Sequence, residues 1–473
     1  MSNYKELLKH SGNYLFATLA TKALSFISIP VYTYLLTVED YGVYNVFSST
    51  LSVATVLLSL NTEVAIGRYF YDSENEKDFK RFVGTSINLI SIVFLIMSFF
   101  MIVFVRPLSD FLGFEWLLII SMIPMALYTI LNSIFQQIYQ PMLQSRKIAV
   151  VSSIQSYLAF GLSVLFMLFL NEKKYYGLVL GTIMAMLILA TYSINQIKPY
   201  CIRSFDAKYI SYIFKYSIPY LPYSLSGIII AQFGKIFIGQ QQGFETAGLY
   251  SFAANISSIM LILIFVVHSA WNPFYFRYMN EKDYESLNND YNLIWRGTLT
   301  AGLFLSFFGK ELGMLLGRPE FASGLSLIPV FVLGYVFYQW SYVYMRNVGY
   351  SKQTIWNAVA VIITGVSNII LNFVLSPLFY DYGVALAFMF SYLILLIVSW
   401  FINKIFLKQY ASSVKLFLSP FILFLMLIIG GVFINESIDS DFVAFFMKLM
   451  VSVTANVLIM KKYLKMFCVF IKR

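Results

Sequence analysis

Residues 83–105 read VGTSINLISIVFLIMSFFMIVFV and contain no charged side chain. An α-helix needs about 20 apolar residues to cross the hydrocarbon core of a bilayer. Similar runs recur along all 473 residues, of which 59% are hydrophobic and only 12% are charged, and the mean hydropathy is +0.74. Lipid must therefore be the solvent for most side chains, and the sequence predicts an all-α polytopic membrane protein.

Apolar windows of this length predict about fourteen transmembrane helices. They lie near residues 13–36, 43–66, 83–105, 115–138, 148–170, 177–196, 213–238, 247–271, 293–316, 324–345, 354–376, 383–404, 416–435 and 442–460. The first window is too long for a signal peptide and lacks a small-residue cleavage site, so we expect it to remain as the first span. The loops between windows are short and leave no room for a soluble catalytic domain.

Basic residues set the predicted topology. Most of the 33 lysines and arginines fall in segments that are cytoplasmic when the N-terminus lies inside. The positive-inside rule then predicts that both termini are cytoplasmic and that the number of spans is even. The net charge of +10 thus reports topology, and no nucleic-acid partner is expected. The two cysteines, Cys201 and Cys468, lie in predicted cytoplasmic segments, so no disulfide is expected.

The chain contains an internal repeat. HSGNYL at 10–15 matches YSIPYL at 216–221, and VEDYGVYN at 38–45 matches FETAGLYS at 244–251, both at the same offset along the chain. Six predicted spans separate the copies, and an even number keeps them in the same orientation. The halves are therefore expected to be related by an axis along the membrane normal.

The repeat predicts three parts: an N-terminal six-helix lobe at 1–206, a second six-helix lobe at 207–410, and residues 411–473. The last part holds two additional transmembrane helices and a basic cytoplasmic tail. The predicted fold is thus two pseudo-symmetric six-helix lobes around a central cavity, plus two C-terminal helices.

Polar residues follow one face of several predicted spans at steps of three and four. They are Asn45, Ser48, Ser52, Thr55, Ser59 and Thr62 in the second span, Thr18, Lys22, Ser25, Ser28 and Tyr32 in the first, and Ser251, Asn255 and Ser258 in the eighth. Such residues can bond back to their own helix or let neighbouring helices pack closely, and this alternative stays open. Stripes on several spans favour a hydrated cavity between the halves.

Basic residues within or beside the spans suggest the charge of a passenger. Lys22 lies about 14 Å deep by helical rise, where a lysine costs about 2.5–3.5 kcal/mol, and no acid lies at mid-depth in any predicted span. Lys235, nearer the outer end of the seventh span, can alternatively snorkel to the interface. Arg68, Arg277 and Arg296 lie near the cytoplasmic mouth, where many arginines only anchor topology. Together they predict a cation-lined path for an anion such as phosphate or pyrophosphate.

The candidate substrate-binding residues are Lys22, Arg68, Lys235, Arg277 and Arg296, with Ser25, Ser52, Thr55 and Asn255. No metal-ligand spacing, nucleotide-binding loop or nucleophile constellation is present in the sequence, so no enzyme, metal or cofactor is expected. Glu63, Glu311 and His268 read either as proton carriers or as solvated anchors and satisfied core groups. Thr37 reads as the N-cap of a helix, with Asp40 at the third position.

The segments LLTVEDYGVYNVFS at 35–48 and EVAIGRYFYD at 63–72 resemble the N-terminal signature of bacterial polysaccharide flippases. These are the Wzx-type translocators of O-antigen and capsule units in the multidrug/oligosaccharidyl-lipid/polysaccharide exporter superfamily. The resemblance implies a central cationic cavity lined by spans 1, 2, 7 and 8, in the bacterial cytoplasmic (inner) membrane. It also implies outward movement of an undecaprenyl-pyrophosphate-linked oligosaccharide by alternating access, with the polysaccharide polymerase machinery as a further partner.

One departure from that family concerns Gly234-Lys235, where many members carry an Asp-Arg-like pair. The positive charge is kept and the acid is lost, so an ion-coupling role is not carried over. Two spans beyond twelve also occur in relatives of the lipid II flippase type, which leaves a peptidoglycan or teichuronic-type substrate open.

Our hypothesis is that Lys22 engages the pyrophosphate, that Arg68 and Arg277 recruit it, and that Lys235 receives it. One alternative is a membrane polysaccharide polymerase or ligase, which requires a large outer loop with catalytic residues. Another is a multidrug exporter, which requires acids at mid-membrane.

Overall fold

A computed structural model of the chain describes residues 24, 26–437, 446–452 and 454, and these are helical apart from short connections. Eleven helices in this described part are long and apolar enough to cross a membrane. The chain is therefore an all-α, multi-pass membrane protein, which confirms the predicted class. It divides into two compact units, Met1–Gly248 and Leu249–Arg473, which are described separately.

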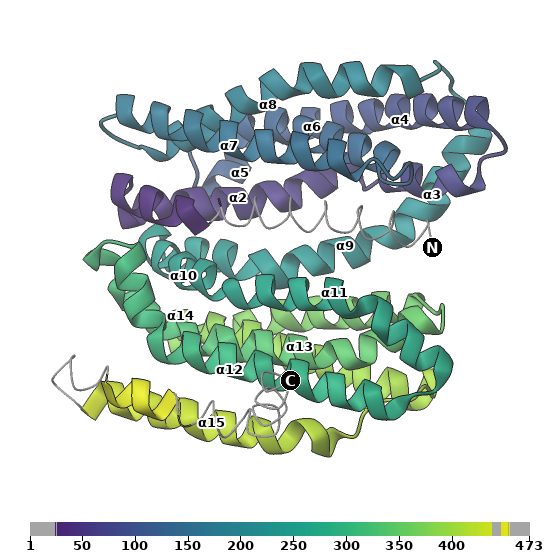
Figure 1. The fold of residues 1–473 in the computed structure, drawn as a ribbon. Helices are drawn as coiled ribbons and strands as arrows, with labels where there is room; N and C mark the ends of the chain where they lie inside the picture. The colour runs from purple at the N-terminus through teal and green to yellow at the C-terminus, as the bar shows by residue number, and fades with distance from the viewer. Residues whose placement is uncertain (1–23, 25, 438–445, 453, 455–473) are drawn as a thin grey trace. The chain divides into compact units, whose positions relative to one another are not determined.

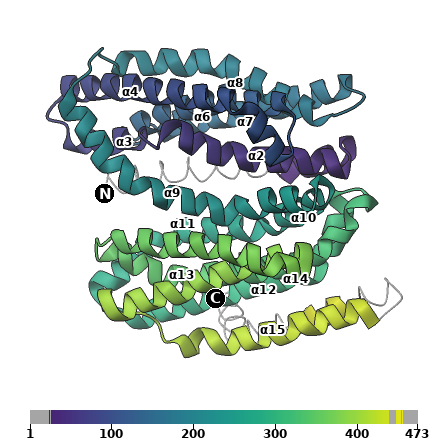
Figure 2. The ribbon, with the colours of Figure 1, turned by 180° about the vertical axis from the view of Figure 1, so that it is seen from behind.

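The first unit is a bundle of helices that run alongside one another (Figures 1 and 2). After a short apolar helix at Phe26–Leu35, its elements are α2 (Val38–Ser59), α3 (Val64–Asp72), α4 (Glu76–Val103), α5 (Val105–Leu112), α6 (Trp116–Tyr139), α7 (Ser145–Phe169), α8 (Tyr175–Ile197), the 3-10 turn η1 (Lys198–Tyr200) and α9 (Ala207–Gln241). The first turn of α10 (Phe244–Ser257) also belongs to this unit.

Helix α2 begins where the sequence provides a cap. The Thr37 side chain accepts a hydrogen bond from the Asp40 backbone N–H at 3.0 Å, which confirms Thr37 as the N-cap. The helix ends at Ser59 because Leu60 and Asn61 adopt left-handed backbone angles, with φ of 49° and 53°. The window predicted at 43–66 therefore begins five residues after the start of α2 at Val38 and extends past its end at Ser59.

The first turns of α2 and α10 approach each other through two glycines. A Cβ built on Gly42 would lie 1.8 Å from the Phe244 carbonyl oxygen. A Cβ built on Gly248 would lie 2.1 Å from the Val38 carbonyl oxygen. Because Phe244 and Gly248 are the repeat partners of Val38 and Gly42, each copy approaches the other in the same way, as a local twofold relation requires. No side chain fits at either glycine.

Helices α7 and α8 pack through small residues. Cβ atoms built on Gly177 and Gly181 would lie 2.6 Å from the Met167 nitrogen and 2.3 Å from the Ser163 nitrogen. The Ser163 hydroxyl also donates to the Leu178 carbonyl oxygen at 3.1 Å. This Gly-x-x-x-Gly spacing brings two helix backbones into contact, which is a common way for helices to associate in lipid.

The second unit continues through α10 into α11 (Ile259–Glu281), α12 (Tyr284–Leu316), the 3-10 segment η2 (Pro319–Leu327), α13 (Ile328–Tyr350), α14 (Ile355–Ile402), the π-helical turn η3 (Asn403–Leu407) and α15 (Val414–Ser437). Figures 1 and 2 show α15 beside α12 at the edge of this unit. The Trp295 indole N–H on α12 donates to the Phe417 carbonyl oxygen on α15 at 3.0 Å.

Helix α14 is two spans joined at a kink. Its 48 residues would measure about 72 Å if straight, more than twice the hydrocarbon thickness of about 30 Å. Tyr380 interrupts it with φ 51° and ψ −127°. Asn368 and Ser391, on opposite sides of the kink, share a hydrogen bond at 3.0 Å, so the two arms lie side by side. The arms correspond to the windows predicted at 354–376 and 383–404.

The count of about fourteen spans and the division at 206 and 410 stay predictions. Residues 1–23 and 455–473, which contribute to the first and last predicted spans, lie outside the described residues.

We predict that Gly42→Ala destabilises the protein by about 3 kcal/mol or more, because its Cβ would overlap a backbone oxygen that cannot move alone. The thermal melting temperature of the purified protein measures this. Gly227→Ala on α9 is the matched control, since a Cβ there meets nothing within 4 Å, and it should melt at or above the wild-type temperature. Equal melting of the two variants would contradict the packing described here.

Candidate functional site

The predicted site residues are distributed over both units. Lys22 and Ser25 lie outside the described residues. The first unit holds Arg68 on α3, Ser52 and Thr55 on α2, and Lys235 on α9. The second unit holds Asn255 on α10, Arg277 on α11 and Arg296 on α12.

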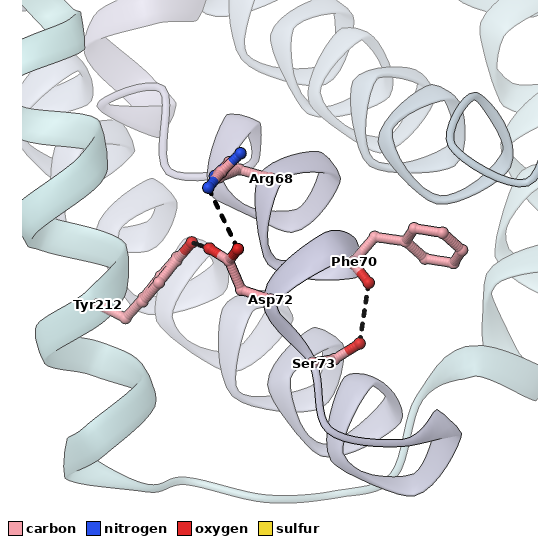
Figure 3. A network of polar contacts seen from close by, with 5 residues as sticks. All are labelled: Arg68, Phe70, Asp72, Ser73 and Tyr212. Carbon is pink, nitrogen blue, oxygen red and sulfur yellow. Dashed lines mark hydrogen bonds and ion pairs between the residues drawn. The ribbon is translucent and has the colours of Figure 1, made fainter.

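Arg68 lies in a network that ties α3 to α9 (Figure 3). Its guanidinium forms an ion pair with Asp72 one turn later, at 3.2 Å. The other carboxylate oxygen of Asp72 accepts a hydrogen bond from the Tyr212 hydroxyl at 2.6 Å. The Arg68 and Asp72 side chains are 53% and 36% exposed, so the pair contributes only about 0–1 kcal/mol. The guanidinium is positioned at an exposed surface.

The same end of this unit is held by a second carboxylate. Asp78 accepts hydrogen bonds from the hydroxyls of Tyr69 at 2.9 Å and Tyr209 at 2.6 Å. The Tyr69 ring stacks on Phe82 with 3.8 Å between ring centroids. The EVAIGRYFYD segment thus supplies Arg68, Tyr69 and Asp72 to one packed cluster of α3, α4 and α9.

Lys235 is half-buried on α9. Tyr212 lies on the same helix, 235 − 212 = 23 residues earlier, which corresponds to about 35 Å of helical rise. Arg68 and Lys235 therefore do not share one cluster. Arg68 lies beside the α9 turn that carries Tyr212, and Lys235 lies near the other end of α9.

The hydroxyls of the predicted stripe on α2 bond back to their own helix. Ser52 donates to the Ser48 carbonyl oxygen at 3.0 Å, and Thr55 donates to the Leu51 carbonyl oxygen at 2.8 Å. This is the alternative that the sequence left open. Ser49 also reaches the Gln232 side-chain oxygen on α9 at 2.9 Å and joins the two helices.

The predicted stripe is wrong at its last position. Thr62 lies in the turn after α2, and its hydroxyl donates to the Ser59 carbonyl oxygen at 2.7 Å. The neighbouring Glu63 is only 6% exposed, and its Oε2 has no hydrogen-bond partner among the described residues. The turn between α2 and α3 is thus buried and polar, a feature that a continuous helix would not produce.

The predicted residues of the second unit differ in exposure. Arg277 is exposed and lies over two aromatic rings of its own helix. Arg296 is half-buried, and its Nε donates to the Asn292 side-chain oxygen at 2.6 Å. Asn255 is half-buried beside the break between α10 and α11, where its carbonyl oxygen accepts from the Ser258 hydroxyl at 2.6 Å.

A more deeply buried cation lies on α13 of the second unit. Arg346 is 9% exposed, and its Nη2 lies 2.5 Å from the His268 Nδ1 and donates to the His268 carbonyl oxygen at 3.2 Å. His268 Nε2 lies 2.7 Å from the Gln339 side-chain oxygen. The guanidinium carbon is 4.7 Å from the Trp271 ring centroid and 5.5 Å from that of Tyr275. No carboxylate in the described part of the chain forms an ion pair with Arg346.

This cluster was not recognised from the sequence. Arg346 directly follows the window predicted at 324–345, where a basic residue is typical of a topology anchor. The available signal was helical spacing: Trp271 and Tyr275 are four residues apart on one helix, and Tyr342 and Arg346 are four apart on another. Each cation–π contact contributes about 0.5–2 kcal/mol, whereas burying an ion costs several kcal/mol. The three ring contacts of Arg346 therefore offset a large part of the cost of burying its charge.

A pocket of about 310 Å³ lies among the helix ends of the first unit that are predicted to face outward. Its lining combines the carboxylates of Glu39, Asp40 and Glu115 with the rings of Phe114 and Tyr175.

Glu115 is held at this pocket by hydrogen bonds from the Lys173 ammonium and from the Tyr176 hydroxyl, the latter at 2.6 Å. Lys173 first and Tyr176 second hold the pKa of the Glu115 carboxyl below its usual value. The pairing is therefore complete at neutral pH and is lost as the pH falls through that lowered pKa.

Comparison with known proteins places the chain among relatives. Residues 7–279 match the family described as polysaccharide biosynthesis protein. The chain belongs to this family. Its predicted resemblance to the Wzx-type proteins is thereby confirmed. A curated relative, Lsg locus putative protein 1 of Haemophilus influenzae (strain ATCC 51907 / DSM 11121 / KW20 / Rd), is 24% identical over 290 residues, which cover 59% of this chain and 68% of that protein.

Solved structures show the same fold. The lipid II flippase MurJ in its inward closed conformation superposes with a TM-score of 0.73 at 15% identity. The superposition covers 96% of this chain and 99% of MurJ. A MATE protein in its straight conformation gives 0.58 at 15% identity, over 85% and 96% of the two chains. At these identities the likeness defines the fold alone.

Two ion pairs of this family member should contribute differently to the stability of the protein, because one is buried and the other is exposed. Glu311→Gln breaks the 2.6 Å pair with Lys448, whose side chain is 2% exposed, and should cost about 3 kcal/mol because a buried ammonium loses its carboxylate. Asp72→Asn breaks the exposed pair with Arg68 and should cost less than about 1 kcal/mol. Thermal melting of both purified variants tests this, and a larger loss for Asp72→Asn would contradict the burial argument.

Proposed function

We propose that the protein translocates an undecaprenyl-pyrophosphate-linked oligosaccharide, the repeat unit of an O-antigen, capsule or other surface polysaccharide. It moves the unit by alternating access from the cytoplasmic to the outer leaflet of the bacterial cytoplasmic membrane, with both termini in the cytoplasm. The observation that carries the proposal is the match of residues 7–279 to the polysaccharide biosynthesis family. A fold shared with a lipid II flippase over 96% of the chain supports a lipid-linked passenger.

The physical argument rests on the two parts of such a substrate. Sugar hydroxyls cannot cross hydrocarbon without hydrogen-bond partners, so the head group needs a polar path through the protein. The polyprenyl tail is soluble in lipid and stays there.

The pyrophosphate accounts for the basic residues. Lys22 engages it within the membrane, Arg68 and Arg277 recruit it at the cytoplasmic mouth, and Lys235 receives it farther along α9. Arg68 and Arg277 are exposed, which suits recruitment, and Lys235 is half-buried, which suits a later step. An inside-negative membrane potential contributes about 2.3 kcal/mol per charge per 100 mV to outward movement of an anion. The potential can therefore set the direction.

A polysaccharide polymerase or ligase is the enzyme alternative. Such an activity requires an outer loop large enough for catalytic residues. Between Val38 and Ser437, the connections between helices are short, and the longer ones are residues 201–206 and 408–413. This favours a transporter, and the superfamily of the related structures consists generally of non-enzymes.

A multidrug exporter is the transport alternative, because MATE proteins share the fold. The MATE structure superposes less closely than MurJ, with a TM-score of 0.58 against 0.73. The candidate path is also lined by cations, which would repel cationic drugs.

Complementation tests the proposal. The wild-type gene is expressed in bacterial strains that each lack one polysaccharide flippase, and surface glycan is measured. We expect glycan to return in one strain, and to be lost again with Lys22→Ala or Lys235→Ala while the protein remains in the membrane. Lys215→Ala is the matched control, because Lys215 is an exposed cation on the same helix as Lys235.

Two results would count against the proposal. One is that no strain regains glycan although the protein is inserted. The other is that both Lys22→Ala and Lys235→Ala restore glycan as well as Lys215→Ala does, which would remove the roles assigned to the two lysines.

A further inference from the structure

The buried side chains around Trp271 in the second unit present more hydrogen-bond donors than acceptors. The Nε and Nη1 of Arg346 and the hydroxyl of Tyr291 are buried, and none of the three has a hydrogen-bond partner in the described part of the chain. Arg346 is 9% exposed and Tyr291 is 3% exposed. Trp271 contacts both residues: its ring centroid is 4.7 Å from the guanidinium carbon and 4.7 Å from the ring centroid of Tyr291.

The groups that face Arg346 do not neutralise it. Since the guanidinium N–H points at the His268 Nδ1, that nitrogen acts as the acceptor and Nε2 carries the proton that is donated to Gln339. His268 is then a neutral ring and brings no negative charge. The nearby Asp290 accepts a hydrogen bond from the Trp271 indole N–H at 2.8 Å and forms no ion pair with Arg346.

The guanidinium lies over three aromatic rings, and these leave its Nε and Nη1 without an acceptor among the described residues. Trp271, Tyr275 and Tyr342 lie 4.7, 5.5 and 5.9 Å from its carbon atom. Such contacts stabilise the positive charge but accept no hydrogen bond in the plane of the group. A buried donor without an acceptor is unfavourable, and a buried charged donor more so. An anion with several oxygen atoms would supply the missing acceptors.

We propose that Arg346 and Tyr291, with Trp271 beside them, form a binding site for a phosphate group. Phosphate offers several charged oxygens, which match a guanidinium and a hydroxyl at once. Arg346 lies one turn before the end of α13 at Tyr350, at the end predicted to be cytoplasmic. Given the proposed function, the ligand is the pyrophosphate of the lipid-linked substrate at an early step, and a free phosphate would present the same chemistry.

The donor atoms are covered in this conformation, so binding requires Trp271 and Tyr291 to move. Trp271 therefore reports the event. The experiment uses the full-length protein in nanodiscs, titrated with inorganic phosphate, inorganic pyrophosphate and farnesyl pyrophosphate. Binding is followed by calorimetry and by the change in tryptophan fluorescence on titration. The part of that change that is lost in Trp271→Phe is assigned to Trp271.

We expect saturable binding by the wild type and a loss of affinity of about tenfold or more in Arg346→Gln. Tyr291→Phe, which removes only the hydroxyl and keeps the packing, should weaken binding about fivefold. Lys404→Gln removes an exposed cation of the same unit and should bind as the wild type does. Tighter binding of farnesyl pyrophosphate than of inorganic pyrophosphate assigns the site to a lipid-linked ligand, whereas equal affinity assigns it to the free anion.

The site is overturned if the wild type binds none of the three anions, or if Tyr291→Phe and a folded Arg346→Gln bind as tightly as the wild type. A parallel transport assay separates this result from the proposed function. Transport without Arg346-dependent binding rejects the site alone, and Arg346-dependent binding without transport of any lipid-linked saccharide rejects the function alone.

Discussion

Direct contact between helix backbones is the constraint on which the helix packing of this protein depends. In lipid, apolar side chains gain little by leaving one hydrocarbon environment for another, so helices associate through close packing and hydrogen bonds. Gly42 and Gly248 allow one such contact in the first unit, and Gly177 and Gly181 allow another. Gly42 and Gly248 are repeat partners in the sequence, and each lies against the first turn of the helix that carries the other.

Charge is the second constraint, and the structure meets it differently at each basic residue. Arg68 is exposed and paired with Asp72, and Lys448 is buried and paired with Glu311. Arg346 is buried among aromatic rings and beside a neutral histidine. A buried site for an anion needs a cation that is not permanently neutralised, since a buried carboxylate partner would compete with the passenger, whereas water screens an exposed pair such as Arg68–Asp72. Arg346 meets that requirement, although it lies outside the set of cations that the sequence suggested.

Hydropathy and helical spacing were enough to predict the membrane class, the capping role of Thr37 and the two arms of α14. They could not place the end of α2, because the left-handed turn at Leu60 and Asn61 occurs within an apolar window and has no glycine to mark it. The same turn removed Thr62 from the predicted stripe. The site residues were harder still, because a basic residue at the end of a span reads as a topology anchor. Only the positions of Trp271, Tyr291 and His268 in space distinguish Arg346 from an anchor.

Movement of a lipid-linked saccharide across a bilayer is the activity that we propose for this chain. Its most direct measurement uses the purified protein in proteoliposomes that contain a fluorescent undecaprenyl-pyrophosphate-linked oligosaccharide, with a membrane-impermeant quencher or glycosidase added outside. We predict that the protein increases the rate at which the labelled head group changes leaflet, and that a potential negative on the side of origin increases it further. The result that would contradict this activity is a rate equal to that of protein-free liposomes for every lipid-linked saccharide tested. Those tested must include the saccharide made by the strain that regains surface glycan.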